Sequence, residues 1–284
     1  MTQLLPKSLL DALEAGRCVP VLGHQALEGI TDTQGNAMPA DSDSLIIAMN
    51  NGRPMAPKLM YEFPRAAMNI ELKRGRKAVT RFLDTTYRDT QWSASSFHQQ
   101  LAGAGFDYLI DLNRDTQLQN FWSRTPHLLV VGVARIGGGT ERYRLFQHDG
   151  EAYYPVTLET VDSSLPILFK PVGTPVPESL YIASDADYVD YLTELMGGFG
   201  MPPFLKQKRK GCQYLLLGLK LDRDTPRMLI NDIVYDAGHP AGWACIQDPT
   251  PKEARFLERQ GFEVLNLSHQ DCLNAVLTEV NAHA

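Results

Sequence analysis

The last third of the chain alternates regularly between apolar and amphipathic segments. Short apolar runs predict strands at 212–219, 243–248 and 262–267, and capped helical patterns lie between them at 225–238 and 250–261. Strands that alternate with helices form right-handed βαβ units, and the parallel sheet that results is covered by helices on both faces. This alternation therefore restricts the chain to the α/β class.

The first two thirds of the chain add strands to this sheet and contain two segments of a different kind. Residues 42–105 have a helical pattern throughout. Residues 135–160 carry the turn dipeptides Gly137-Gly138 and Asp149-Gly150 between alternating segments, which predicts a β-hairpin. Further strands are predicted at 18–22, 106–113, 127–134 and 165–170, and further helices near the N-terminus, at 184–198 and at the C-terminus. We expect an α/β fold: one domain over residues 1–284 with a doubly wound, mostly parallel Rossmann-like sheet, a helical insertion and a hairpin insertion.

The charge of the chain argues against two classes of partner. The sequence has 27 Lys and Arg against 33 Asp and Glu, a net charge of -6. Nucleic acids and anionic membranes both favour a basic surface. A run of 18 apolar residues is absent from the sequence, and Asp11 and Glu14 interrupt the apolar N-terminal segment, unlike a signal peptide. We therefore expect a cytoplasmic protein with neither a nucleic-acid nor a membrane partner.

The four cysteines are widely spaced, and no two of them form a CxxC pair. This spacing does not predict a zinc site, so no metal is expected. Small buried thiols are common in and beside strands. We expect all four to be reduced, as in other cytoplasmic proteins: Cys18, Cys212, Cys245 and Cys272.

The stretch VLGHQALEG, residues 21–29, raises the question of a nucleotide site. Val21-Leu22-Gly23 reads as a buried strand that enters a glycine turn, where α/β proteins commonly bind phosphate. His24 and Gln25 follow in place of further small residues. The segment is therefore a functional nucleotide-binding turn, a modified one, or a turn that binds no nucleotide.

The order of segments from about residue 7 to 267 resembles the bacterial sirtuin-like family, relatives of the NAD-dependent protein deacylases that include NAD-hydrolysing defence proteins. The family's Gly-Ala-Gly loop corresponds to Gly23, His24 and Gln25. Two of its motifs correspond to FHQQLA with His98 and to DLNRD with Asp111, Asn113 and Asp115. The next two correspond to KPVG with Lys170, Val172 and Gly173, and to DY at Asp187 and Tyr188. The last corresponds to GLKLD with Gly218 and Asp222, in which Lys220 stands where a serine is usual.

The resemblance implies NAD cleavage in the family, and two departures from the motifs bear on it. Asn113 stands where the family's asparagine positions water or a ribose hydroxyl. Val172 stands where the family has a histidine that removes a proton, and an isopropyl group cannot do so. Loss of a general base lowers a rate by about 10²–10⁴-fold. His24 and Gln25 also bring side chains into the space where the family binds pyrophosphate.

The resemblance further implies which residues would contact NAD or an ADP-ribose-like nucleotide: Gly23, His24, Gln25, Asn113, Asp115, Gly218 and Asp222. The polar residues of this set also have a purely structural interpretation. His24 and Asp222 could cap the helices that follow them, and Asn113 with Asp115 could form an Asx turn that caps the next helix. The basic run 206–210 is best explained as a solvated helix end.

Three functions remain open. The preferred one is a degenerate sirtuin-like protein with impaired catalysis that binds a nucleotide-like ligand, a protein partner or a second copy of itself. The second is an active NAD hydrolase with a relocated base, and the third is a structural protein with a closed cleft. Protein deacylation is not expected, because the zinc-binding cysteines and the histidine are both missing. The residues considered as substitute bases are His98, His127, His148, His239, Asp111 and Asp115.

Overall fold

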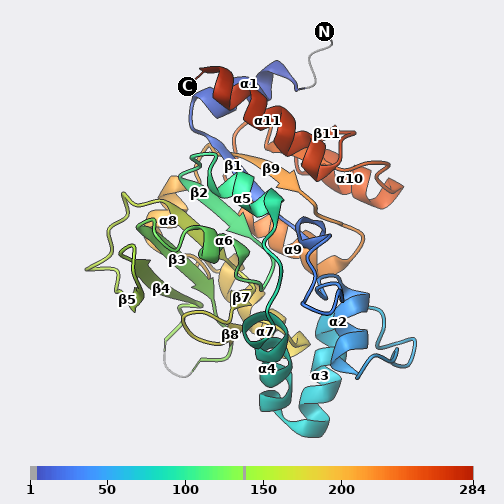
Figure 1. Ribbon diagram of the computed structural model, residues 1–284. Coiled ribbons are helices and arrows are strands. Elements are labelled where there is room, and N and C mark those ends of the chain that lie inside the picture. The colour runs from blue at the N-terminus through green and yellow to red at the C-terminus, as the bar shows by residue number, and fades with distance from the viewer. Residues whose placement is uncertain (1–4, 137–138, 284) are drawn as a thin grey trace.

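The computed structural model describes residues 5–136 and 139–283. Within them, one large sheet of nine strands organises the fold (Figure 1). Its strands are β1 (Cys18–Leu22), β2 (Tyr108–Asp111), β3 (His127–Gly132), β4 (Tyr143–His148), β5 (Tyr153–Pro155), β6 (Ile167–Lys170), β9 (Gln213–Leu217), β10 (Gly242–Cys245) and β11 (Phe262–Leu265). Their order across the sheet is β11-β10-β9-β1-β2-β6-β3-β4-β5, and all neighbours from β11 to β3 are parallel.

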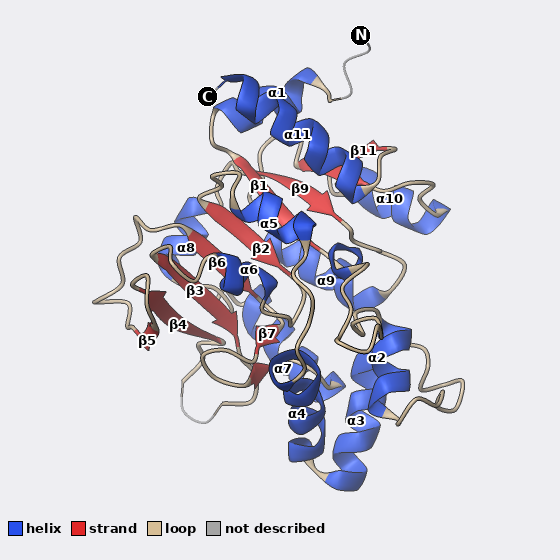
Figure 2. Cartoon of the chain, viewed as in Figure 1, coloured by secondary structure: helices blue, strands red, loops and turns tan. Residues whose placement is uncertain are grey.

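Helices cover both faces of this sheet, as the alternation of segments predicted. Successive side chains of a strand point to opposite faces, so Val21 contributes to one apolar core and Leu22 to the other. The Leu22 face is covered by α1 (Lys7–Glu14), α5 (Ser96–Ala102), α6 (Gln117–Phe121) and α11 (His269–His283). The Val21 face is covered by α7 (Asp185–Met196), α8 (Pro203–Lys208), α9 (Asp224–Ile233) and α10 (Pro251–Arg259). Figure 2 shows α1 and α11 side by side near the two ends of the chain.

The helical segment has a core of its own. It contains α2 (Ser42–Met49), α3 (Phe63–Arg74), α4 (Arg76–Asp84) and the π-helical turn η2 (Thr85–Asp89). These elements bury Ile46, Phe63 and Leu83 together beside the sheet. The expected insertion at 42–105 is therefore helical, but its last helix, α5, packs on the sheet instead, because Phe97 and Leu101 lie in the Leu22-side core.

The hairpin expected at 135–160 is present, but it belongs to the main sheet instead of forming an insertion. β4 and β5 are antiparallel and turn at Asp149-Gly150, as predicted. However, β4 also pairs antiparallel with β3, so the hairpin extends the main sheet and is not a separate insertion. Without β4, β3 would be the edge strand of the sheet, and its backbone N–H and C=O groups on that side would have no partners. β4 supplies these hydrogen bonds. The Gly137-Gly138 turn lies outside the described residues. A further two-stranded sheet was not predicted: β7 (Gly173–Thr174) with β8 (Leu180–Tyr181).

The expectation of four reduced cysteines is wrong. Cys245 at the end of β10 and Cys272 in α11 form a disulfide, with Cα atoms 6.5 Å apart. The two cysteines are 27 positions apart in the sequence, which hid this proximity; it arises because α11 packs back across the sheet. Cys18 and Cys212 are free and buried. No helix within residues 5–136 and 139–283 combines the length and apolar character that crossing a membrane requires.

Candidate functional site

The order of the strands reverses direction at β1. The chain continues from β1 to β2 on one side, and later places β9 on the other side. In doubly wound sheets, ligands bind beyond the carboxyl ends of the strands at this switch point. A cavity of about 210 Å³ lies there, between the ends of β1, β2 and β9 and the helical segment.

Five of the predicted site residues line this cavity together: Gly23, His24, Asn113, Val172 and Asp222. They come from segments spread over 200 residues of sequence. The other three predicted contacts, Gln25, Asp115 and Gly218, do not line it. The fold therefore assembles most of the predicted positions at one place, and their interactions indicate what that place can do.

Three backbone N–H groups of the glycine turn donate to carbonyl oxygens of the protein itself. The N–H of Gly23 donates to Leu217 O (2.9 Å), that of Gln25 to Gly218 O (3.0 Å), and that of Ala26 to Gly23 O (3.1 Å). The chain here forms the 3₁₀ helix η1 (His24–Leu27). A phosphate-binding loop needs such N–H groups free to point at the anion. The amides of Gly23, Gln25 and Ala26 are therefore not presented to a ligand.

Asn113 ties the end of β2 to that turn. Its Nδ2 donates to Gly23 O over 3.0 Å, and its backbone N–H donates to Asp111 Oδ1 over 2.9 Å. Asp115 Oδ1 accepts from the N–H of Gln117, the first residue of α6, over 2.8 Å. The Asx-turn interpretation thus accounts for the observed hydrogen bond of Asp115. Asp222 does not cap α9, whose N-cap is Arg223.

A buried ion pair lies beneath the site. Lys170 Nζ pairs with Asp111 Oδ2, and their side chains are 1% and 0% exposed. Burial raises the pKa of Asp111, and the ammonium of Lys170 opposes this rise. His98 is also fully buried, and its Nδ1 contacts Ser95 Oγ at 2.8 Å. Because none of these three side chains lines the cavity, they do not serve there as a base.

The other candidate bases lie elsewhere. His127 begins β3 and stacks on His148, with ring centroids 5.1 Å apart. His239 precedes β10. All three are therefore at the amino-terminal edge of the parallel strands, opposite the cavity. Val172 itself is 2% exposed and presents an apolar side chain to the cavity.

His24 is the one histidine of the described residues that lines the cavity. It begins η1 and makes no side-chain capping bond, so the cap interpretation is wrong. Burial lowers the pKa of its imidazole, while Asp41 acts in the opposite direction. A lowered pKa keeps the ring neutral near pH 7, able to accept a proton or hydrogen bond.

Arg114 lines the cavity and was not singled out from the sequence. It is 7% exposed, and its Nη2 donates to Ile182 O (2.5 Å) and to Tyr188 Oη (3.1 Å). The guanidinium lies over the ring of Phe63, 5.4 Å from its centroid. The sequence signal that could have identified Arg114 as a site residue is its position between Asn113 and Asp115, directly after the predicted strand 106–113.

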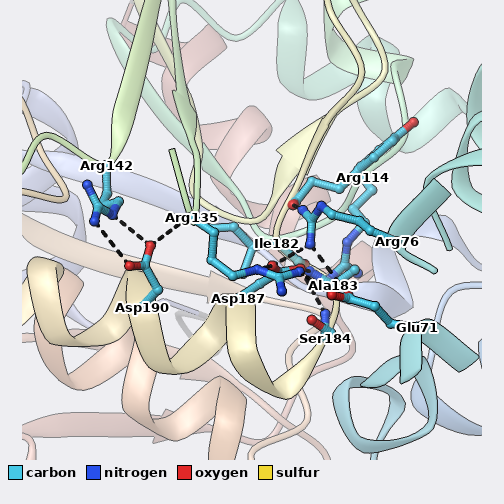
Figure 3. Close-up of polar contacts among 11 residues, drawn as sticks. Glu71, Arg76, Arg114, Arg135, Arg142, Ile182, Ala183, Ser184, Asp187 and Asp190 are labelled. Atoms are coloured by element: carbon cyan, nitrogen blue, oxygen red, sulfur yellow. Dashed lines mark hydrogen bonds and ion pairs between the residues drawn. The ribbon is translucent and has the colours of Figure 1, made fainter. Parts of the chain in front are cut away.

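An ionic network next to Arg114 holds the helical segment against α7 (Figure 3). Asp187 is fully buried and accepts from the backbone N–H groups of Ala183 and Ser184, each over 3.0 Å. It also pairs with Arg76 and, over 2.7 Å, with Arg135. Arg135 in turn pairs with Glu71 of α3 (2.7 Å), and the neighbouring Asp190 pairs with Arg142 (2.6 Å). These contacts orient α7, and therefore Tyr188, at the cavity wall.

Comparison of the sequence with protein-family models and with curated proteins finds no match. The sirtuin-like resemblance accordingly stays a prediction from the motifs. Within the described residues, no group of three His, Cys, Asp or Glu side chains is arranged to hold a metal ion.

Proposed function

We propose that this chain is a sirtuin-like α/β protein that binds a nucleotide-like ligand, such as the AMP part of NAD or of ADP-ribose, and does not hydrolyse NAD. The observation that carries the proposal is the state of the glycine turn. Gly23, Gln25 and Ala26 donate their amide protons to backbone carbonyls, so these three amides of the usual pyrophosphate cradle are occupied. The ligand is therefore held by side chains of the cavity.

The lack of catalysis follows from the cavity wall. Val172 replaces the proton acceptor that the resemblance implies, and Asn113 uses its Nδ2 to hold Gly23 O. The cavity of about 210 Å³ is also smaller than the roughly 300–1,000 Å³ of pockets that enclose drug-sized ligands. A mononucleotide-sized group suits it better than a complete dinucleotide.

Calorimetric titration with NAD, ADP-ribose and AMP tests this function, together with an assay for released nicotinamide. We expect saturable binding of at least one nucleotide and no nicotinamide. Asn113→Ala should weaken binding, whereas Asn231→Ala on the exposed side of α9 should not. Absence of binding by all three compounds would favour the closed-cleft alternative, in which the protein serves only in assembly with a partner.

One observation favours a second candidate, an NAD hydrolase with a relocated base. The imidazole of His24 shares the cavity with Asn113, and its pKa is lowered by burial. Nicotinamide release by the wild-type protein that His24→Gln abolishes would establish this activity. Gln25→Ala is the matched control, because the adjacent Gln25 does not line the cavity.

A further inference from the structure

Arg114 is a buried cation without an ionic partner among the described residues. Its Nη2 donates to two neutral oxygens, those of Ile182 and Tyr188. Its Nε is enclosed and has no hydrogen-bond acceptor. Nη1 also donates to no described group and, unlike Nε, is not enclosed. A buried charge is normally paired and fully hydrogen-bonded, so this arrangement is incomplete as it stands.

The nearby carboxylates are engaged elsewhere. Asp41 caps α2 by accepting from the N–H of Ser44 over 2.7 Å. Glu62 accepts from the N–H of Thr225 over 3.1 Å. Asp187 is already paired with two arginines. No carboxylate of the described residues forms an ion pair with Arg114, and the cavity that it lines gives a ligand access to it.

The surroundings of Arg114 define the rest of the ligand. Phe63, Val172 and Leu219 are buried apolar side chains that line the same cavity. They suit a planar or apolar group beside the anion. Two further cations line the cavity, Arg223 and the exposed Lys220, and so do four carboxylates: Asp41, Asp43, Glu62 and Asp222.

We propose that Arg114 is the anion-recognition residue of this cavity, and that the ligand is a small organic anion with one phosphate or carboxylate group and an adjoining ring. The anion accepts hydrogen bonds from the guanidinium, chiefly from Nη1, while the ring packs against Phe63 and Leu219. The inference rests on the proposed function, because it names the ligand class of the same cavity. It also locates anion binding on a side chain instead of the glycine turn.

AMP and adenosine form a matched pair of probes, since they differ only in the phosphate. Calorimetry should show AMP binding to the wild-type protein about 10- to 100-fold more tightly than adenosine, as for hydrogen bonds to a charged group. Arg114→Met should remove this preference and leave adenosine affinity within a few-fold. Lys73→Met removes an exposed cation of α3 that does not line the cavity, and as the control it should retain the preference.

The outcomes separate the two proposals. Equal affinity of the wild-type protein for AMP and adenosine, or an undiminished preference in Arg114→Met, would overturn the role of Arg114 while leaving nucleotide binding intact. Binding of neither probe, nor of ADP-ribose, would overturn the proposed function itself. If Arg114→Met does not fold, Arg114→Lys keeps the charge but loses the planar geometry, and it should show a reduced preference for AMP.

Discussion

A β-carbon placed on Gly23 would lie 2.4 Å from the carbonyl oxygen of Gly218. The ends of β1 and β9 are therefore in direct backbone contact. Gly218 in turn has φ +69°, and a β-carbon there would lie 2.8 Å from Ala26 N. Both glycines are thus required by the packing of this turn, whether or not a phosphate binds to it.

Gly23→Ala should lower the free energy of unfolding by about 1–3 kcal/mol, because the added methyl group overpacks against fixed backbone atoms. Urea denaturation measures the change. Gly103→Ala is the matched control. Gly103 has φ -85°, and the nearest atom to a β-carbon there is 3.6 Å away, so its stability should change little. Equal effects of both substitutions would contradict the close contact.

Lys170→Met should lower the free energy of unfolding by about 3–5 kcal/mol, because it leaves the buried carboxylate of Asp111 without its ionic partner. Adding Asp111→Asn removes the charge and retains an oxygen for the N–H of Asn113. The double variant should therefore be more stable than Lys170→Met alone, as a double-mutant cycle in urea would show. Additive losses would mean that the two groups do not interact.

His127 should make stability depend on pH. Burial lowers the pKa of His127 from 6.5 to about 4, and its neighbour His148 acts in the same direction. The unfolded chain then takes up a proton before the folded protein does, so stability falls as pH drops from about 6.5 towards 4. The loss amounts to about 2–4 kcal/mol. Urea denaturation between pH 7.5 and 4.5 should show a smaller fall for His127→Gln, and identical pH profiles would contradict the shift.

Thiol titration should find two cysteines, since Cys245 and Cys272 are paired. In guanidinium without reductant, Cys18 and Cys212 should react with a thiol reagent, and reduction should raise the count to four. In the folded protein both should react slowly, because burial raises the pKa of each thiol. Four reactive thiols before reduction would show that the disulfide is not formed.

Local patterns in the sequence were sufficient to predict most of the helices and strands. The apolar run 18–22 became β1, and the Thr250 cap with Pro251 began α10 as expected. Patterns of this kind reflect local physics: strand side chains alternate, and helix ends need caps. The hairpin at 135–160 was recognised by its turn residues, but its pairing with β3 was not, because local residue patterns do not specify which other strand of the sheet a strand pairs with.

By itself, the sequence determined the α/β class and the order of the strands along the chain. Only the tertiary structure decided that the amides of Gly23, Gln25 and Ala26 are consumed within the protein, and that Arg114 is buried beside a cavity. The reason is physical. Secondary structure follows from side chains a few residues apart, whereas burial, hydrogen-bond partners and unpaired charge depend on segments that meet only when the sheet forms.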